Sequence, residues 1–156
     1  MALSPNLVCN SPTVSGQEDF SHAVARIERL GKHLFGVSAC VVYLHTEKEL
    51  LVASEAHQFC AQLPLTDDLQ VVPEKSSPFQ AALGKFDNVE VRFYALQPLR
   101  DSTGKIVGRM ALIHERSRMF TAGDKDCLVD LVALFERELH FRTSSLSAHP
   151  DVTLPS

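Results

Sequence analysis

The chain lacks the segments that insert proteins into membranes or carry them across. No stretch approaches the roughly 20 consecutive apolar residues that a spanning helix needs. Residues 1–5 hold no basic region ahead of an apolar one, as a secretory signal would. We therefore expect no membrane span and no secretory signal, and a protein located in the cytoplasm.

An excess of positive charge is also lacking. Fifteen Lys and Arg face nineteen Asp and Glu, which gives a net charge of −4. The chain offers no general attraction for a polyanion, so nucleic-acid binding is disfavoured. Close cysteine pairs are absent too, because the nearest two cysteines, Cys40 and Cys60, are 20 residues apart. The four cysteines are interpreted as reduced thiols.

Catalytic motifs are equally scarce. Phosphate-loop glycines, paired carboxylates in one motif and a Gly-x-Ser-x-Gly elbow are all missing. His57 and Cys60 lie close together and could form a metal half-site or an activated thiolate, but no second pair completes a zinc site. The simpler interpretation of Cys60 is a small buried thiol. We expect no metal site and no enzyme.

Hydrophobic periodicity predicts two helices around a group of strands. Apolar residues recur at three- and four-residue steps from residue 18 to a stop near Gly36, with Leu30 and Leu34 in the stripe. A second helix starts at a capping box of Thr121 and Asp124 and runs to about Arg142. Strands are predicted at 38–46, 49–54, 70–72, 89–99 and 105–115, with short helices allowed between them, for example around 78–83.

The order of these elements indicates the fold class. Residues 38–54 and 89–115 form two hairpins, the second closed by a tight turn containing Asp101 and Gly104. Hairpins flanked by a first and a last helix favour an α+β domain with an antiparallel sheet and both helices on one face. The domain is predicted over residues 18–142, between flexible tails at 1–17 and 143–156.

Alternation along the strands predicts which sheet face is free for a ligand. The set containing Cys40, Val42 and Met110 is apolar and should face the helices, and the opposite set mixes in polar groups. Arginine forks and an imidazole among aromatic walls would suit a carboxylate or phosphate. The predicted ligand-binding residues are Tyr43, His45, Phe59, Phe79, Arg92, Tyr94, Arg109 and Ala111.

A structural role for the same residues stays open. Arg92 and Arg109 could instead be solvated or paired with nearby carboxylates such as Glu90 and Glu115, since surface ion pairs are common. Tyr94 could simply pack in the core with its hydroxyl at the edge. Arg118, close to Glu115, is predicted to lie in an exposed turn.

Several short motifs occur in the order of a known family. They are VRFYA at 91–95, Pro98-Leu99, Asp101, Gly104, Gly108, Arg118 and Glu138-Leu139. The pattern resembles a GAF domain over about residues 18–142, in particular the bacterial subgroup whose strands read RFYA. The resemblance implies a loop-covered ligand pocket on the open sheet face. It also implies a last helix that leads to an output domain such as a diguanylate cyclase, phosphodiesterase or histidine kinase.

Three functions follow from this resemblance. The first is a cytoplasmic sensory or regulatory domain that binds an unknown small ligand or partner and signals through its terminal helices to an output domain in cis or in trans. The second is a ligand-free dimerisation module, favoured by Arg109, Ala111 and His114 at positions where relatives often carry other residues. The third is a thiol-dependent enzyme similar to free methionine sulfoxide reductases, with Cys60 as nucleophile. The cofactor is unknown, because the resemblance does not identify one.

The last helix also predicts assembly. Its main apolar stripe is narrow enough to be covered by the sheet alone. Leu134 and Phe141 lie outside that stripe, seven residues apart, which is the spacing of a second seam along one helix. We therefore expect a homodimer through the terminal helices, parallel or antiparallel.

Overall fold

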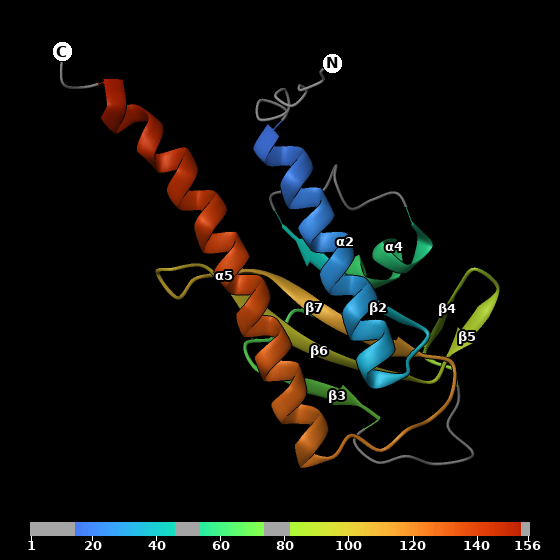
Figure 1. Cartoon of the computed structure of the whole chain (residues 1–156). Coiled ribbons are helices and arrows are strands. Elements are labelled where there is room, and N and C mark those ends of the chain that lie inside the picture. Colours follow the sequence, from blue (N-terminus) through green and yellow to red (C-terminus); the bar gives the residue numbers. More distant parts are fainter. Residues whose placement is uncertain (1–14, 46–53, 74–81, 154–156) are drawn as a thin grey trace, which may run out of the picture.

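The computed structural model of the protein describes residues 15–45, 54–73 and 82–153. Two long helices, α2 and α5, lie next to each other across one face of an antiparallel sheet (Figure 1). None of the helices in the described ranges is both long enough and apolar enough to cross a membrane. The elements in chain order are α2 (Ser15–Phe35), β2 (Ala39–Leu44), α4 (Glu55–Ala61), β3 (Gln70–Val72), β4 (Gly84–Phe86), β5 (Val89–Val91), β6 (Phe93–Arg100), β7 (Ile106–His114) and α5 (Ala122–Thr153).

The predicted helices are present, with different limits. Helix α2 starts at Ser15, and α5 continues to Thr153, so the predicted end near Arg142 is wrong. The capping box is confirmed, because the N–H of Asp124 donates to the Thr121 hydroxyl and that of Thr121 donates to the Asp124 carboxylate. Leu30 and Leu34, predicted in the buried stripe, are about half exposed at 48% and 52%.

The described sheet confirms the α+β class. Its main part has the strand order β2-β7-β6-β3 with every neighbouring pair antiparallel, and β4 and β5 form a separate two-stranded hairpin. The predicted hairpin of 89–115 is present as β6 and β7. The Asp101 carboxylate closes its turn by accepting the N–H groups of Thr103 and Lys105.

Some elements differ from the prediction, and others lie outside the described residues. The strand predicted at 89–99 breaks at Arg92, so Val91 belongs to the small hairpin and Phe93 to the main sheet. Helix α4, which follows directly from Ser54, lies in a segment where the sequence allows a short helix without giving its bounds. The strand at 49–54 and the short helix around 78–83 fall mostly on residues outside the described ranges.

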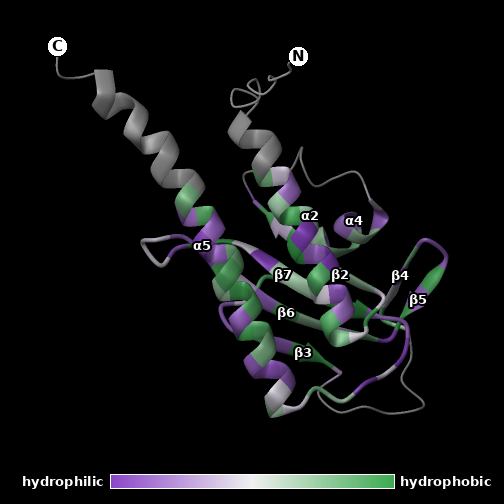
Figure 2. Ribbon diagram, viewed as in Figure 1, coloured by the Kyte–Doolittle hydropathy of each residue, from purple (hydrophilic) through white to green (hydrophobic). Residues whose placement is uncertain are grey.

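The sheet separates two apolar cores, as the strand alternation predicts. Cys40, Val42 and Met110 pack with the inner faces of α2 and α5. Tyr94 and Ala111 pack on the opposite face with Phe59 of α4. Figure 2 shows hydrophobic and hydrophilic residues alternating along α2 and α5, as in helices with one buried side. Val91 has the same alternation as Phe93 and Ala95, which face the helices, but the break at Arg92 places it in the second core.

Candidate functional site

Arg109 is a buried charged side chain at the centre of the predicted pocket face. It lies on β7 with 5% of its surface exposed. Its guanidinium donates to the carbonyl oxygens of Leu63 and Pro64, both at 2.8 Å, and of Ala61 at 3.2 Å. Its charge therefore meets the carbonyl end of α4, where a cation is favoured. This bonding differs from the carboxylate pairing considered from the sequence.

Tyr43 and His45 accompany Arg109. The Arg109 guanidinium lies 5.5 Å from the centre of the Tyr43 ring, and the rings of Tyr43 and His45 are 5.9 Å apart. A cavity of about 240 Å³ opens beside them. Its volume is slightly below the roughly 300 Å³ at which pockets for drug-sized ligands begin, so it suits only a small molecule. The lining residues are His45, Leu65, Thr66, Asp67, Ile106, Gly108 and Arg109.

Gly108 lines this cavity and has no room for a side chain. A Cβ atom at this position would come within 2.2 Å of the Tyr43 carbonyl oxygen and 2.9 Å of the Leu44 Cα. Only glycine allows β2 and β7 to pair this closely, because no backbone atom can move aside. Gly108 therefore permits the pairing of β2 with β7 that places Tyr43 opposite Arg109.

The remaining predicted residues on this face fill the interior rather than line a cavity. Phe59 packs against Phe86 with ring centres 6.2 Å apart, in one cluster with Tyr94 and Ala111. Burial raises the pKa of the Tyr94 hydroxyl. Phe79 lies outside the described residues. Within the described chain, the face under α4 is thus packed by the protein's own aromatic side chains.

Arg92 lies far from Arg109 in the structure. Its N–H donates to the carbonyl of His114, five residues along β7 from Arg109, a separation of about 16 Å in a strand. Its guanidinium pairs with Glu90 at 2.6 Å, and both side chains are substantially exposed. Arg92 lines a separate open cleft of about 770 Å³ with Lys85, Asn88, Val89, Glu90, Glu115, Arg116 and Ser117. One small ligand cannot contact both arginines.

His57 and Cys60 have separate structural roles. The His57 ring lies between the Ser54 hydroxyl at 2.6 Å and the Glu28 carboxylate at 2.8 Å. Cys60 is fully buried, and burial raises the pKa of its thiol to about 12, although the nearby Arg109 opposes this. The described residues contain no cluster of metal-ligating side chains. A thiol of this kind is a poor nucleophile at neutral pH.

Glu28 is a connecting residue that the sequence did not single out. The same carboxylate oxygen accepts the His57 ring N–H and the N–H of Val42, each at 2.8 Å. It therefore ties α2 to α4 and to strand β2. In the sequence, Glu28 differs from its neighbours only in being an acidic residue among the basic Arg26, Arg29 and Lys32 of α2.

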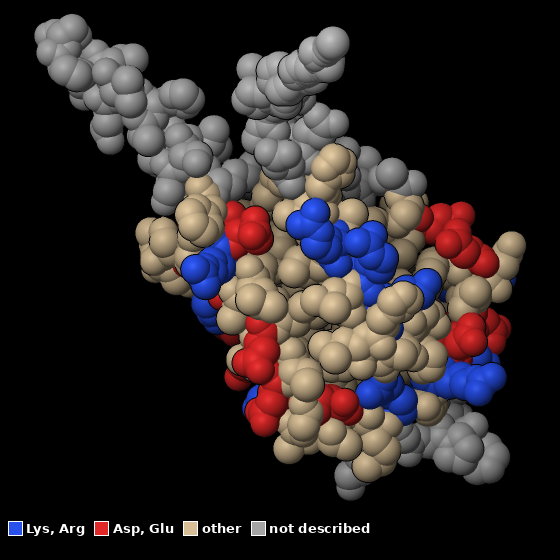
Figure 3. Space-filling view, in the orientation of Figure 1, with Lys and Arg blue, Asp and Glu red and all other residues tan. Residues whose placement is uncertain are grey.

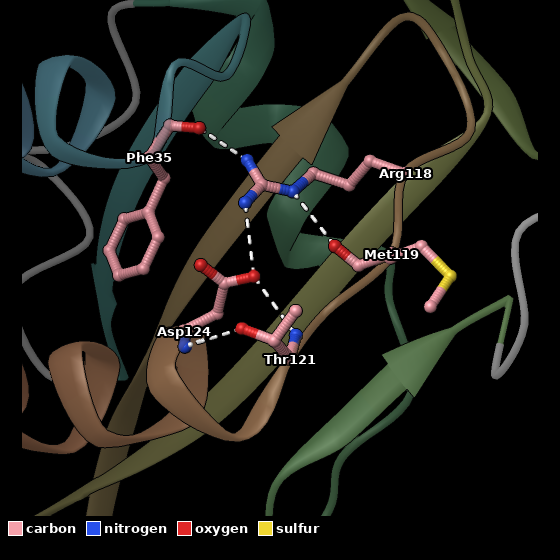
Figure 4. A network of polar contacts seen from close by, with 5 residues as sticks. All are labelled: Phe35, Arg118, Met119, Thr121 and Asp124. Atoms are coloured by element: carbon pink, nitrogen blue, oxygen red, sulfur yellow. Dashed lines mark hydrogen bonds and ion pairs between the residues drawn. The ribbon is translucent and has the colours of Figure 1, made fainter.

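Arg118 is a second connecting residue, and the prediction of an exposed turn is wrong for it. Its guanidinium donates to the carbonyl of Phe35, the last residue of α2, and to the Asp124 carboxylate in the first turn of α5 (Figure 4). A third bond reaches the carbonyl of Met119. The hydrogen bonds join the end of one terminal helix to the start of the other.

Large apolar side chains are exposed on both terminal helices. Leu134 and Phe141 are 54% and 62% exposed, and Leu30 and Leu34 of α2 are about half exposed. Gly31 of α2 lies against Leu131 of α5, so these exposed residues belong to neighbouring helix surfaces. The four side chains form the outer apolar patch, a name used below for Leu30, Leu34, Leu134 and Phe141.

The chain belongs to the GAF domain family, because the family model matches residues 19–139. Its fold is similar to that of a domain from a two-component sensor histidine kinase of Sinorhizobium meliloti, with a TM-score of 0.59 at 11% identity, covering 86% of this chain and 96% of that one.

Two structures of cyanobacterial photoreceptors are also similar. The cyanobacteriochrome receptor PixJ matches with a TM-score of 0.58 at 12% identity, over 81% of this chain and 98% of that one. The PixJ GAF domain of Thermosynechococcus elongatus matches with a TM-score of 0.57 at 14% identity, over 88% and 96%. No curated protein matches the chain.

Proposed function

We propose that this GAF domain is a cytoplasmic sensory or regulatory module that passes a signal through α2 and α5 to an output domain in cis or in trans. The observation that carries the proposal is the Arg118 network, which links the end of α2 to the start of α5. The names of its structural relatives, a sensor histidine kinase and a photoreceptor, support a sensory role. A change at the sheet can then reach both helices together.

Dimerisation through the terminal helices is part of this proposal. The outer apolar patch supports it, since large apolar side chains exposed on neighbouring helices are a usual mark of an interface. Light scattering at micromolar concentration should report twice the chain mass. Leu134→Glu with Phe141→Glu should halve that mass, and Leu65→Glu, at an exposed leucine away from the helices, serves as the matched control. A wild-type monomer at high concentration contradicts the dimer.

The small cavity beside Tyr43, His45 and Arg109 is the proposed ligand site. The arginine and the imidazole support a small molecule carrying a carboxylate or phosphate, within about 240 Å³. Thermal-shift screening against small acids, amino acids and nucleotides tests this. A ligand at this site should lose affinity in His45→Ala and keep it in Arg92→Ala, because Arg92 lines the other cleft. Equal loss in both variants contradicts the assignment.

A ligand-free dimerisation module is the second candidate. Three carbonyls already occupy the Arg109 guanidinium, and His114 is hydrogen-bonded to the Ser38 hydroxyl at 3.1 Å, so both groups have structural partners. Absence of any thermal shift across the ligand screen, together with a stable dimer, would favour this candidate over the sensor.

A further inference from the structure

The larger open cleft is separate from the small cavity and is bordered by the β4–β5 hairpin and the segment that follows β7. Its volume of about 770 Å³ is within the usual range for small-molecule sites. The hairpin contributes Lys85, Asn88, Val89 and Glu90, the segment after β7 contributes Glu115, Arg116 and Ser117, and Arg92 directly follows β5. Figure 3 shows basic and acidic side chains close together on the side of the molecule where β4 and β5 lie.

The fold brings cations from three segments to this cleft. The N–H of Arg92 donates to the carbonyl of His114 at 2.9 Å, which joins the end of β5 to the end of β7. The three cations are Lys85 on β4, Arg92 after β5 and Arg116 after β7. All of them are at least partly exposed, so a ligand can reach them from solvent.

The charge of the cleft is opposite in sign to that of the whole chain. The three cations face two carboxylates, those of Glu90 and Glu115, which gives the lining a net charge of +1. The chain as a whole carries a net charge of −4. A cleft that stays positive on an acidic protein favours an anionic ligand, because clefts concentrate the field of the charges that line them.

Glu90 already places one anion in this cleft. It pairs in register with Lys85 across the hairpin, and its carboxylate accepts the Arg92 guanidinium at 2.6 Å. The side chains of Arg92 and Glu90 are 38% and 54% exposed, and exposed ion pairs of this kind contribute little to stability. An anion of higher charge can therefore displace Glu90 from Arg92 at small cost.

Displacement of Glu90 leaves a charge that suits a phosphate group. The three cations then face only Glu115, and the resulting charge of +2 balances a phosphate dianion. A planar carboxylate carries a single charge and would only replace that of Glu90. The guanidinium of Arg92 can also donate two parallel N–H groups to a pair of phosphate oxygens.

We propose that this cleft binds a phosphate group, either free or as the monoester of a small molecule, with Arg92 as its main contact and Lys85 and Arg116 beside it. The site also has a connection to the terminal helices. Ser117 lines the cleft and directly precedes Arg118, which joins α2 to α5. An anion bound here acts on both helices through Arg118, a step that rests on the signalling function proposed above.

Titration with inorganic phosphate at about pH 8 and constant ionic strength, followed by amide NMR of the full chain, tests the site. The signals of Arg92, Arg116 and Ser117 should shift, and those of Gly108 and Arg109 beside the small cavity should not. Acetate should bind about tenfold more weakly, because it carries one charge. Binding of glycerol phosphate that is tighter than that of inorganic phosphate identifies a monoester as the ligand, and equal binding identifies the free ion.

Two substitutions at the ion pair should change the affinity for phosphate in opposite directions. Arg92→Gln should weaken binding about tenfold or more, because it removes a charged hydrogen-bond donor. Glu90→Gln should strengthen binding about two- to fivefold, because no carboxylate then competes for Arg92. Lys105→Gln and Glu138→Gln make the same changes of charge at exposed positions outside the cleft, and as matched controls they should leave the affinity unchanged.

The outcomes separate the phosphate site from its connection to the helices. No binding by the wild type, or binding of acetate as tight as that of phosphate, refutes the site. So does unchanged affinity in Arg92→Gln or weaker binding in Glu90→Gln, when the variant keeps the circular dichroism of the wild type. These results leave the proposed function of the domain unaffected. Phosphate-induced shifts at Phe35 and Asp124 support the route through Arg118, and shifts confined to the cleft refute that route.

Discussion

At the scale of single residues, Arg118 is a side chain whose loss should destabilise the fold. Its bonds to Phe35 and Asp124 are charge-assisted, and hydrogen bonds to charged groups contribute about 1.5 to 3 kcal/mol each. Because two bonds from one guanidinium are not additive and both side chains are partly exposed, Arg118→Ala should lower the free energy of unfolding by about 2 to 4 kcal/mol in urea titrations. Arg116→Ala, at an exposed neighbour, is the control. Equal effects of the two changes would contradict the role given to Arg118.

Protonation of the Asp124 carboxyl should make the stability of the fold depend on pH. Its partial burial would raise the pKa of its carboxyl, but hydrogen bonds from Thr121 and Arg118 outweigh this and hold the pKa below its ordinary value of 3.8. A lowered folded-state pKa stabilises the fold above the ordinary value, and this stabilisation is lost as pH falls through the folded-state pKa. The loss should appear below about pH 4 and be smaller in Asp124→Asn, measured by urea unfolding at each pH.

Two cysteines should differ sharply in reactivity. Cys127 is exposed on α5, whereas Cys60 is fully buried with the pKa of its thiol raised to about 12. Because the thiolate is the reactive form, iodoacetamide at pH 8 should alkylate Cys127 in the folded protein and spare Cys60. Peptide mass spectrometry measures both. Alkylation of Cys60 at the rate of Cys127 would reopen the thiol-enzyme interpretation.

At the scale of elements, the packing of α2 on β2 depends on Gly31. A Cβ atom there would come within 2.5 Å of the Cys40 sulfur and 3.0 Å of Leu131. Overpacking costs about 1 to 3 kcal/mol, partly offset by about 1 kcal/mol of better helix propensity. Gly31→Ala should therefore destabilise the domain modestly. The double variant Gly31→Ala, Cys40→Ala should lose less free energy of unfolding than the two single variants lose in total. A double-mutant cycle in urea would measure this difference.

Elements that depend on residues close together in the chain were the ones that the sequence predicted. The helix stripes, the capping box and the hairpin of β6 and β7 were predictable because each depends on residues close in the chain. The bounds of helix α4, in a segment where short helices were allowed, were not predictable, because Glu28 and Arg109, which hold it, lie far from it in sequence. The break at Arg92 was also missed, since continuous β-propensity from 89 to 99 hides a change of sheet.

The candidate site was predictable only in part, for a related reason. Alternation placed Tyr43, Tyr94 and Arg109 on the correct face because that depends on the pleat alone. It could not reveal that the partners of Arg109 are carbonyls 45 to 48 residues away. Nor could it show that the strand register separates Arg92 from Arg109, because register is set by pairing between strands.

At the scale of the whole molecule, dimerisation should be visible in thermal unfolding. If the folded dimer dissociates on unfolding, mass action makes its melting temperature rise with protein concentration. A tenfold increase is worth about 1.4 kcal/mol per dimer, or about 0.7 kcal/mol per chain. A domain of this size shifts by roughly 2 to 4 °C per kcal/mol. Calorimetry should therefore show a rise of about 1.5 to 3 °C per tenfold step in concentration.

The outer apolar patch provides the variant that tests this rise. Leu134→Glu with Phe141→Glu changes side chains that are more than half exposed, so the fold of each monomer should survive. Its melting temperature should not vary with concentration, while that of the control Leu65→Glu should rise as in the wild type. A wild-type melting temperature that stays constant from micromolar to millimolar concentration would mean that α2 and α5 present this patch to something other than a second copy of the domain.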